Sequence, residues 1–365
     1  MINTSIGRVL NLKRGYDLTK DQMNEGYTPV VGSNGIIGYH NKFNVKRPVI
    51  TVGRSGTVGK PHIYFEDCWV HNTALYIDDF KGNNPEYLFY LLKGLNIDKV
   101  ASSTGVPTLN RNFVHPIKIN FENDLGKQKD IAKILMNIDL KIANNSKINE
   151  ELELMAKTLY EYWFLQFEFP NEEGKPYKSS GGKMVWNEEL KREIPQGWEV
   201  KHAHEIAEIK TGKEDANHAT KNGQYPFFTC SNEILNCDDY RFEGNVILIA
   251  GNGDFNVKHY NGRFNAYQRT YVVKPHEDKH VGLFHLCSLL TVDQFKRGSN
   301  GSIVKFIKLG DVQNIKMLDS KKDEIYDVFN VYLKKISSLN RENQELISLR
   351  DFLLPLLMNG QVTFK

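Results

Sequence analysis

The chain has 365 residues, of which 40% are hydrophobic and 25% are charged, and its net charge at pH 7 is only +3. This length predicts two or three domains at roughly 100 to 200 residues each, and the composition excludes an intrinsically disordered chain. No segment approaches the roughly 20 consecutive apolar residues of a membrane span, and the first residues lack the pattern of a signal peptide. We therefore expect a cytoplasmic protein.

The first block, residues 1–121, is the most basic part of the chain. Residues 1–120 carry 14 Lys and Arg residues against nine Asp and Glu residues, a balance that allows a nucleic-acid partner. Short apolar runs separated by Gly, Asn and Pro predict strands, of which residues 49–52 run into a glycine-bearing turn. A short helix is expected over residues 85–95, with Pro85 at its first position. The block is expected to be an α+β domain.

A long helix is expected next, over residues 122–167, because apolar residues recur there in alternating steps of three and four. Residues 168–194 are rich in turn-forming residues and weakly patterned, which predicts a linker.

The second block, residues 195–318, repeats the first, and a second long helix is expected over residues 319–358. Four segments of the first block recur in the same order in the second: residues 12–15 match 209–212, 49–56 match 246–253, 103–105 match 299–301, and 116–119 match 314–317. Such a repeat predicts two copies of one structural unit.

Each long helix has an apolar stripe that needs a partner, and we expect the other copy within the chain to supply it, with a second chain as the alternative. An antiparallel coiled coil with pseudo-twofold symmetry follows, in which Asn149 and Asn343 are hypothesised to meet and fix the register. The alternative is that each Asn faces water or a bound partner. Pro355 is expected to end or kink the second helix near Leu354. The predicted pairing residues are Ile131, Leu135, Ile138, Ile142, Asn149, Leu152, Leu159, Ile325, Phe329, Tyr332, Ile336, Asn343, Leu346 and Leu353.

Catalytic and metal-binding motifs are incomplete throughout the sequence, so no catalytic or metal-binding residues are predicted. Residues 53–60 approach the GxxxxGK[ST] phosphate loop, but that pattern requires glycine in place of Arg54 and Ser or Thr in place of Pro61. Residues 83–87 approach the NPPY-type motif of amino-methyltransferases, and a helix start at Asn84-Pro85 explains them better. The four cysteines contain no CxxC pair and are expected to be reduced and buried. They are Cys68, Cys230, Cys237 and Cys287.

Binding chemistry is the positive signal. The loops of both blocks carry Arg, Lys, Asn, Gln and Ser, the side chains that contact guanine, adenine and phosphate in DNA. In the first block the predicted DNA-binding residues are Lys13, Arg14, Ser33, Asn34, Lys46, Arg54, Ser55, Lys60 and Asn72. In the second block they are Lys210, Lys213, Ser231, Asn232, Asn252, Lys258, Gln268, Arg269 and Asn300.

These features together resemble the DNA-specificity subunit of type I restriction-modification systems. The resemblance is carried by VITVGRSGTVGKPHIY at 49–64, YWF at 162–164 with FEFP at 167–170, IPQGW at 194–198, and the duplicated helices. It implies two target-recognition domains, at 1–121 and 195–318, that read the two halves of a bipartite double-stranded DNA site. The helices then form the spacer between them, and 32 steps from residue 131 to residue 163 span about 48 Å, between one and two turns of DNA. Because the loops of the two blocks differ, an asymmetric site is expected.

The resemblance also implies a division of labour among subunits. This chain would be non-catalytic and hold no cofactor, while two methyltransferase (modification) subunits bring S-adenosylmethionine and restriction subunits use ATP and Mg. No membrane partner is implied. The first block has no counterpart of IPQGW, which leaves open whether the short start suffices or the true start lies upstream.

Two other functions stay open at this point. The chain could be a coiled-coil scaffold for protein interactions, which salt-insensitive or absent DNA binding would indicate. It could instead be a self-contained DNA methyltransferase or nuclease, against which the incomplete motifs argue.

Overall fold

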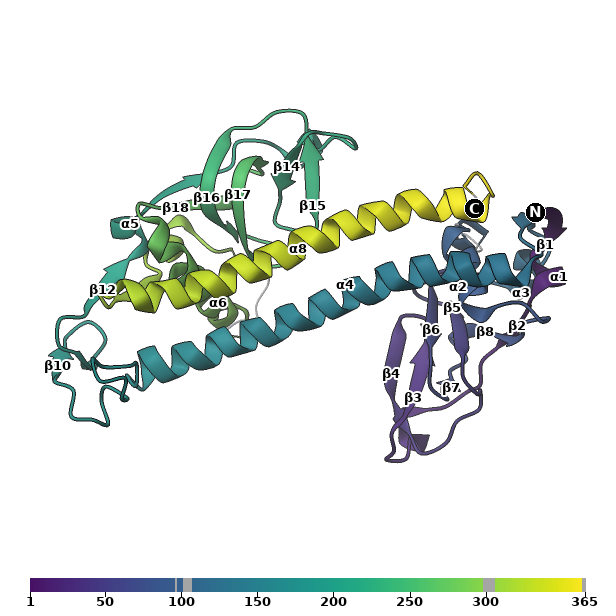
Figure 1. Ribbon diagram of the computed structural model, residues 1–365, viewed down its shortest axis with the longest axis horizontal. Helices are drawn as coiled ribbons and strands as arrows, with labels where there is room; N and C mark the ends of the chain where they lie inside the picture. The colour runs from purple at the N-terminus through teal and green to yellow at the C-terminus, as the bar shows by residue number, and fades with distance from the viewer. Residues whose placement is uncertain (96, 101–106, 298–305, 363–365) are drawn as a thin grey trace. The chain divides into compact units, whose positions relative to one another are not determined.

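The computed structural model describes residues 1–95, 97–100, 107–297 and 306–362. The chain divides into two compact units, which are treated one at a time. The first unit consists of Met1–Asn144 and Asn343–Lys365, and the second consists of Asn145–Glu342 (Figure 1). The first unit is therefore built from both ends of the chain.

In its described residues the first unit contains three small sheets, the start of one long helix and the end of another. Its sheets have the strand orders β2-β8-β5-β6, β4-β3-β7 and β1-β9. In chain order its elements are β1 (Ile2–Ser5), α1 (Ile6–Val9), β2 (Asn11–Arg14), a 3-10 turn (Lys20–Gln22), β3 (Thr28–Gly32), β4 (Gly35–His40), β5 (Val49–Gly53), β6 (Pro61–Tyr64), β7 (Trp69–Val70), β8 (Ala74–Asp79), α2 (Pro85–Gly94), a 3-10 turn (Ile97–Val100), α3 (Arg111–Val114) and β9 (Lys118–Phe121).

Helix α2 begins as its sequence predicts and then forms part of the core. The Asn84 side chain accepts a hydrogen bond from the Tyr87 amide, and Pro85 occupies the first turn, where its missing N–H costs nothing. Residues 87–92 are all buried. They pack with Ile131 and Leu135 of the long helix α4 (Leu125–Tyr160) and with Leu357 of α8 (Asp323–Met358) in one core.

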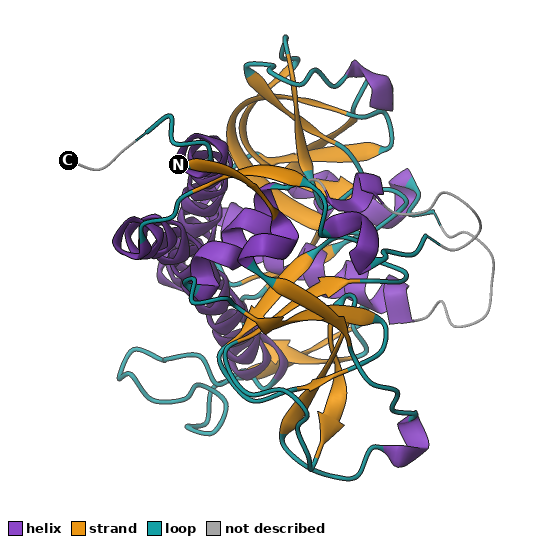
Figure 2. Cartoon of the chain, turned by 90° about the vertical axis from the view of Figure 1, so that its right-hand side faces the viewer, coloured by secondary structure: helices purple, strands orange, loops and turns teal. Residues whose placement is uncertain are grey.

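The second unit is built around a six-stranded sheet with the order β13-β18-β16-β17-β14-β15, accompanied by the pairs β10-β11 and β12-β19. Its elements are a π-type turn (Glu161–Leu165), β10 (Met184–Asn187), β11 (Arg192–Pro195), β12 (Glu199–His202), α5 (Ala203–Ile206), β13 (Ala207–Thr211), a 3-10 turn (Ala216–His218), β14 (Tyr225–Phe228), β15 (Ile234–Cys237), β16 (Phe242–Ala250), β17 (Val257–Ala266), β18 (Thr270–Pro275), a 3-10 turn (Asp278–His280), α6 (Val281–Arg297), α7 (Leu309–Gln313) and β19 (Lys316–Asp319). Each unit combines strands and helices, so the predicted α+β class is confirmed. Figure 2 colours the helices and strands of the chain differently.

Residues of the segment predicted as a linker, 168–194, are packed onto the second unit. Phe169 is 1% exposed and stacks on Trp198, with ring centroids 4.7 Å apart, and also on Tyr177, with ring centroids 4.6 Å apart. The strands β10 and β11 form a hairpin in the same segment. The aromatic residues are too few and too irregularly spaced to give a periodic signal, yet each buries a large apolar area.

The two units repeat one backbone pattern. In the first unit, the amides of Gly15 and Arg54 donate to the carbonyls of Ala74 and Thr73. In the second unit, the amides of Gly212 and Gly251 donate to the carbonyls of Thr270 and Arg269. The amide of Leu109 bonds the Arg54 carbonyl, as the amide of Ile307 bonds that of Gly251. These bonds fix which positions of the two units correspond.

The two long helices, α4 and α8, pair in antiparallel directions, as predicted. Within the first unit, Asp139 of α4 bonds Arg350 of α8 at 2.8 Å, and the Ile142 carbonyl accepts from Asn343 at 3.4 Å. Within the second unit, Asn145 bonds Glu342 at 2.9 Å and Asn149 bonds Asn340 at 2.8 Å. As the residue number rises along α4, the number of its partner falls. All fourteen predicted pairing residues are buried or half-buried.

The predicted meeting of Asn149 with Asn343 needs correction, because Asn149 pairs with Asn340. The strands that precede the helices, β9 and β19, and the equal lengths of 36 residues show that Leu125 corresponds to Asp323. On that basis Asn145, not Asn149, is the counterpart of Asn343, and both are buried. The sequence comparison was displaced by four residues, about one helical turn, and such a shift keeps the same face of a helix inward.

Pro355 does not end α8 near Leu354, because the helix continues to Met358. Leu354, Leu357 and Met358 are buried in the core of the first unit, and this burial holds the last turn in helical form although Pro355 cannot donate its own hydrogen bond. None of the described helices has the length and hydrophobicity needed to cross a membrane.

Candidate nucleic-acid interface

Four segments of the first unit meet around a basic cleft of about 610 Å³. Residues 13–17 comprise the end of strand β2 and the residues after it, Arg54 follows β5, and residues 108–112 comprise the approach to α3 and its first residues, with Leu75 of β8 forming part of the wall. Three predicted DNA-binding residues, Lys13, Arg14 and Arg54, line the cleft together. The cleft therefore gathers cations that lie far apart in the sequence.

Arg54 is positioned by its surroundings. Its guanidinium Nη1 donates to the Asn72 carbonyl at 3.3 Å, and the Asn72 side chain in turn donates to the Asp17 carboxylate. Arg14 lies 3.6 Å from the same Asp17, and both side chains are mainly exposed. Among the described residues that line the cleft, Asp17 carries the single carboxylate, so the lining has a net positive charge, which suits a phosphate-bearing ligand.

The cleft also contains residues that the sequence analysis missed. Arg111 lines it and donates to the Leu12 carbonyl at 3.4 Å, next to Asn110, whose side chain caps α3 by accepting from the Asn112 amide at 2.9 Å. The sequence signal for residues 108–112 was their position before residues 116–119, which match residues 314–317 of the second block. No local motif marks it, because a four-residue helix has no periodicity to detect.

The remaining predicted residues of the first unit lie outside the lining of the cleft. Ser33 lies close to Gly53 at the end of β5. A Cβ added at Gly53 would lie 2.9 Å from the Ser33 carbonyl oxygen. Ser55 forms an isolated bridge with Thr108. Asn34, Lys46 and Lys60 are exposed on loops or at a strand end.

The second unit presents a corresponding set of loops. Lys213 and Gln268 are exposed, and the main chains of their segments are joined by the bond from the Gln268 amide to the Glu214 carbonyl at 2.9 Å. Arg269 is exposed and lies over the Phe306 ring, 5.3 Å from its centroid. Asn252 is half-buried beside Gly251, whose amide bonds the Arg269 carbonyl. These four predicted residues therefore belong to one set of adjoining turns.

Other predicted residues of the second unit are less well placed to reach a ligand. Lys258 donates to Asn256 Oδ1 at 2.9 Å and to the Ser231 carbonyl, and burial lowers its pKa to about 8. Lys210 pairs with Glu208 at 2.6 Å. The amide of Asn232 donates to Asp254 at 3.1 Å. Asn300 lies outside the described residues.

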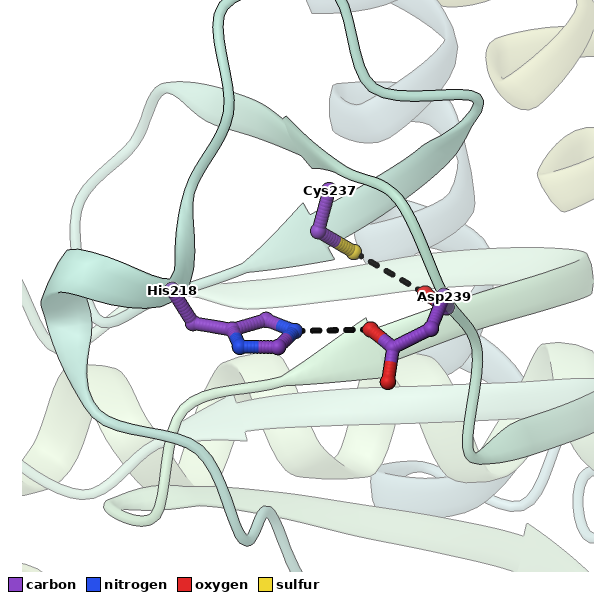
Figure 3. Close-up of side chains that lie close together, drawn as sticks. All are labelled: His218, Cys237 and Asp239. Atoms are coloured by element: carbon purple, nitrogen blue, oxygen red, sulfur yellow. Dashed lines mark hydrogen bonds and ion pairs between the residues drawn. The ribbon is translucent and has the colours of Figure 1, made fainter.

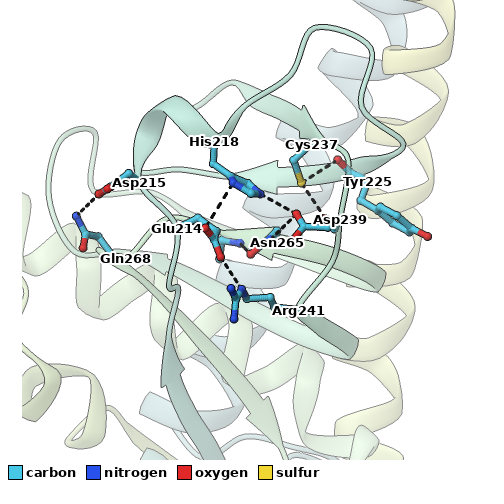
Figure 4. A network of polar contacts seen from close by, with 10 residues as sticks. Glu214, Asp215, His218, Tyr225, Cys237, Asp239, Arg241, Asn265 and Gln268 are labelled. Carbon is cyan, nitrogen blue, oxygen red and sulfur yellow. Dashed lines mark hydrogen bonds and ion pairs between the residues drawn. The ribbon is translucent and has the colours of Figure 1, made fainter.

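A polar network supports the turns of the second unit (Figure 4). Glu214 accepts from Arg241 at 2.5 Å and faces His218 Nδ1 at 3.4 Å, while Asp215 accepts from Gln268 at 2.8 Å. His218, Cys237 and Asp239 form a group of side chains that could hold a metal ion. No metal-binding residues were predicted from the sequence, because these three follow no short spacing motif.

The phosphate-loop near match is not followed by a helix. After Gly59 and Lys60 the chain enters β6, and Gly59 donates its amide to the Gly53 carbonyl at 2.8 Å. A phosphate loop needs a helix N-terminus directed at the anion. The rejection of that motif therefore agrees with the structure.

Comparison with known proteins assigns the family. The model of the type I restriction modification DNA specificity domain matches twice, at residues 3–154 and 195–347. The chain belongs to this family. The two matches coincide with the two repeats of the backbone pattern, each with a long helix behind its globular block.

Individual relatives agree with this assignment. The type I restriction enzyme EcoDI specificity subunit of Escherichia coli is 34% identical over 177 residues, 47% of this chain and 40% of that subunit. The MjaIX specificity subunit of Methanocaldococcus jannaschii is 25% identical over 311 residues, 76% of this chain and 69% of that subunit. A solved S subunit of a type I restriction-modification system from M. genitalium has the same fold, with a TM-score of 0.65 at 18% identity, covering 100% of this chain and 96% of that one.

Proposed function

We propose that this chain is the sequence-recognition subunit of a type I restriction-modification complex, in which each unit reads one half of a bipartite double-stranded DNA site. The observation that carries the proposal is the repeated arrangement of loops with different side chains. At corresponding positions the first unit has Arg54 and the second has Gly251, while Thr73 corresponds to Arg269. One backbone scaffold that presents two sets of polar side chains suits the reading of two different base sequences.

The partners and cofactors of the complex belong to the same proposal. Two methyltransferase subunits would supply S-adenosylmethionine, restriction subunits would use ATP and Mg, and this chain would contribute recognition without catalysis. The long helices are the surfaces we assign to subunit docking. Exposed apolar side chains on them, among them Leu154 at 65% and Phe352 at 65%, support such contacts. A cytoplasmic location follows from a role on cellular DNA and stays a prediction.

DNA binding by the chain alone is the first test. We expect the purified chain to shift the fluorescence anisotropy of a labelled duplex pool, and the affinity to fall steeply between about 50 and 200 mM salt through counterion release. Binding that is absent at low salt, from a folded chain, would favour the alternative of a protein-interaction scaffold.

Methylation mapping is the decisive test. The chain is co-expressed with the methyltransferase subunit of the same restriction-modification system, and the purified complex is given S-adenosylmethionine and a random DNA library. A split, asymmetric methylated motif is the expected result, and exchange of residues 195–318 for those of a homologue should change one half only. A stable complex that methylates without a split motif would contradict the two-reader proposal.

A further inference from the structure

Three side chains with metal-ligand chemistry converge at one corner of the second unit (Figure 3). His218 ends the 3-10 turn Ala216–His218, Cys237 ends β15, and Asp239 follows in the loop to β16. One ligand atom of each, an imidazole nitrogen, a thiol sulfur and a carboxylate oxygen, lies within 4.8 Å of the others. Tetrahedral ligands bound to one cation at about 2.0 to 2.3 Å lie about 3.3 to 3.8 Å apart, so the side chains would have to close in by up to about 1.5 Å on binding it.

The imidazole of His218 is oriented from both sides. Its Nε2 lies 2.7 Å from Asp239 Oδ1, and its Nδ1 lies 3.4 Å from Glu214 Oε2. A cation bound at Nε2 would leave Nδ1–H to donate to Glu214. A carboxylate behind a metal-bound histidine is the usual arrangement at metal sites, because it fixes the ring and increases its basicity. Glu214 is itself held by Arg241 at 2.5 Å.

Cys237 supplies a buried sulfur at the same point. The residue is 0% exposed, and its thiol lies 3.1 Å from the Asp239 carbonyl and 3.6 Å from the Tyr225 carbonyl. Burial raises the pKa of this thiol. The carboxylate of Asp239 is about half exposed, with a side-chain exposure of 55%, and its Oδ1 also accepts from Asn265 at 3.1 Å.

At the corresponding position, the first unit has aromatic packing in place of a group of possible metal ligands. Cys237 pairs with Tyr225 across its hairpin, and the matching position in the first unit is His40, which pairs with Thr28. His40 packs edge-on against Trp69 at 5.3 Å, and its Nδ1 accepts from the Asn24 amide at 3.0 Å. Aromatic packing fills that corner, whereas the second unit places two carboxylates, a histidine and a thiol there.

We propose that His218 Nε2, Cys237 Sγ and the Asp239 carboxylate bind one divalent cation of the zinc type, with water as the fourth ligand. Sulfur, nitrogen and oxygen ligands together favour Zn²⁺ over Mg²⁺ or Ca²⁺, which take oxygen ligands. The cation would join the turn at residues 214–218 to the loop after β15. It would thereby fix the segment that carries Lys213, to which the Gln268 amide is bonded through the Glu214 carbonyl, and this last step rests on the proposed function.

The test uses the full-length chain. After dialysis against a chelator, the protein is titrated with Zn²⁺ by calorimetry and with Co²⁺ by absorption spectroscopy, in which a thiolate-to-cobalt charge-transfer band reports a Cys ligand. The variants are Cys237→Ser, His218→Ala and Asp239→Asn. The matched control is Cys68→Ser, since Cys68 is also buried and also bonds a main-chain carbonyl, at 3.4 Å, but lies in the first unit.

Each outcome decides the proposal. We expect one cation per wild-type chain with the thiolate band, at least a tenfold weaker affinity in the three site variants, and no change in Cys68→Ser. A folded wild-type chain that takes up neither cation overturns the proposal, as does uptake that persists in Cys237→Ser. The wild-type titration decides the matter even if a variant fails to fold.

The proposal can be separated from the proposed function by measuring DNA binding in the same samples. Metal uptake without DNA binding would leave the site standing and remove DNA recognition. DNA binding without metal uptake would overturn the metal site and leave DNA recognition standing. If both hold, removal of the cation should weaken recognition of the half-site read by the second unit and leave the other half-site unchanged.

Discussion

The two units share a backbone and differ in the side chains placed on it. Gly15 and Gly212 occupy the same position, and in each unit an added Cβ would lie 2.2 Å from a main-chain carbonyl oxygen. One residue further on, the first unit has Tyr16 and the second has Lys213. Positions that set the close approach of two segments are thus retained, while positions that face outward vary. The scaffold can therefore be kept while its specificity changes.

The two units also hold their parts of the helix pair by different means. In the first unit, Asp139 of α4 accepts from Arg350 of α8, from Lys93 and from Tyr90 of α2. In the second unit, aromatic packing holds the helices together. The rings of Phe164 and Trp163 pack against Phe329, with centroid distances of 5.8 and 6.1 Å. A charged network and an apolar cluster respond differently to mutation and pH, which gives ways to separate the units experimentally.

The largest expected effect comes from Asp139→Ala. Removal of this carboxylate deletes the ion pairs that it forms with Arg350 and Lys93, which are both partly buried, and leaves Arg350 paired with the exposed Asp351. We expect the first unit to lose about 3 kcal/mol of stability. Hydrogen exchange in urea would show the loss in α2 but not in α6. The control is Glu188→Ala, whose pair with Lys191 is exposed and should contribute little. An equal loss in both units would contradict the assignment.

Acid should weaken the second unit through His259. Burial lowers the pKa of this imidazole to about 4, and its two nitrogens bond Ser337 and Asn245 at 2.7 Å each. The unfolded chain, with an ordinary pKa near 6.5, then binds the proton more readily than the folded unit, so this contribution is complete above pH 6.5 and is lost as the pH falls toward 4. We expect roughly 2 to 3 kcal/mol over that range.

The measurement is urea denaturation at several pH values, followed by hydrogen exchange in β16 and β17. In His259→Gln the slope of stability against pH should become shallower between pH 6.5 and 4. A slope identical to that of the wild-type chain would show that another group causes the acid sensitivity.

The paired substitutions Gly15→Ala and Gly212→Ala test the shared backbone. Each new Cβ would meet a carbonyl oxygen at 2.2 Å, so the adjoining segments must move apart, at a cost of about 1 to 3 kcal/mol. Each variant should lose recognition of one half-site, as judged by methylation mapping. Gly310→Ala is the control, because no atom lies within 4 Å of its added Cβ and its stability should not fall.

The smallest effects are expected from single recognition side chains. Arg54→Ala and Arg269→Ala should each weaken DNA binding by roughly tenfold, and relax the sequence preference of one half-site only if the arginine reads a base. Competition between duplexes mutated in one half or the other measures this. Lys191→Ala, exposed and distant from these loops along the chain, should bind as the wild type does. A variant that matches the wild type in affinity and preference does not contact DNA.

Much of the fold could be predicted from the sequence because its signals are local or repeated. The apolar run of residues 49–52 became β5, and Asn84-Pro85 began α2. The cleft was predicted only in part, since Arg111 joins Lys13 and Arg54 through tertiary folding alone. The helix pairing was recognised, but its register was not, because a seam with steps of three and four matches itself again one turn away. The polar corner at His218 has no sequence motif at all.

The composition of the first unit from both ends of the chain has a consequence for synthesis. Leu354, Leu357 and Met358 belong to its buried core, although the rest of that core is encoded before residue 145. During synthesis, residues 1–144 therefore cannot complete the core of the first unit until residues 343–365 have left the ribosome. The second unit, continuous from residue 145 to residue 342, can complete its core earlier. A chain stopped shortly after residue 342 should accordingly contain a folded second unit and an incomplete first one.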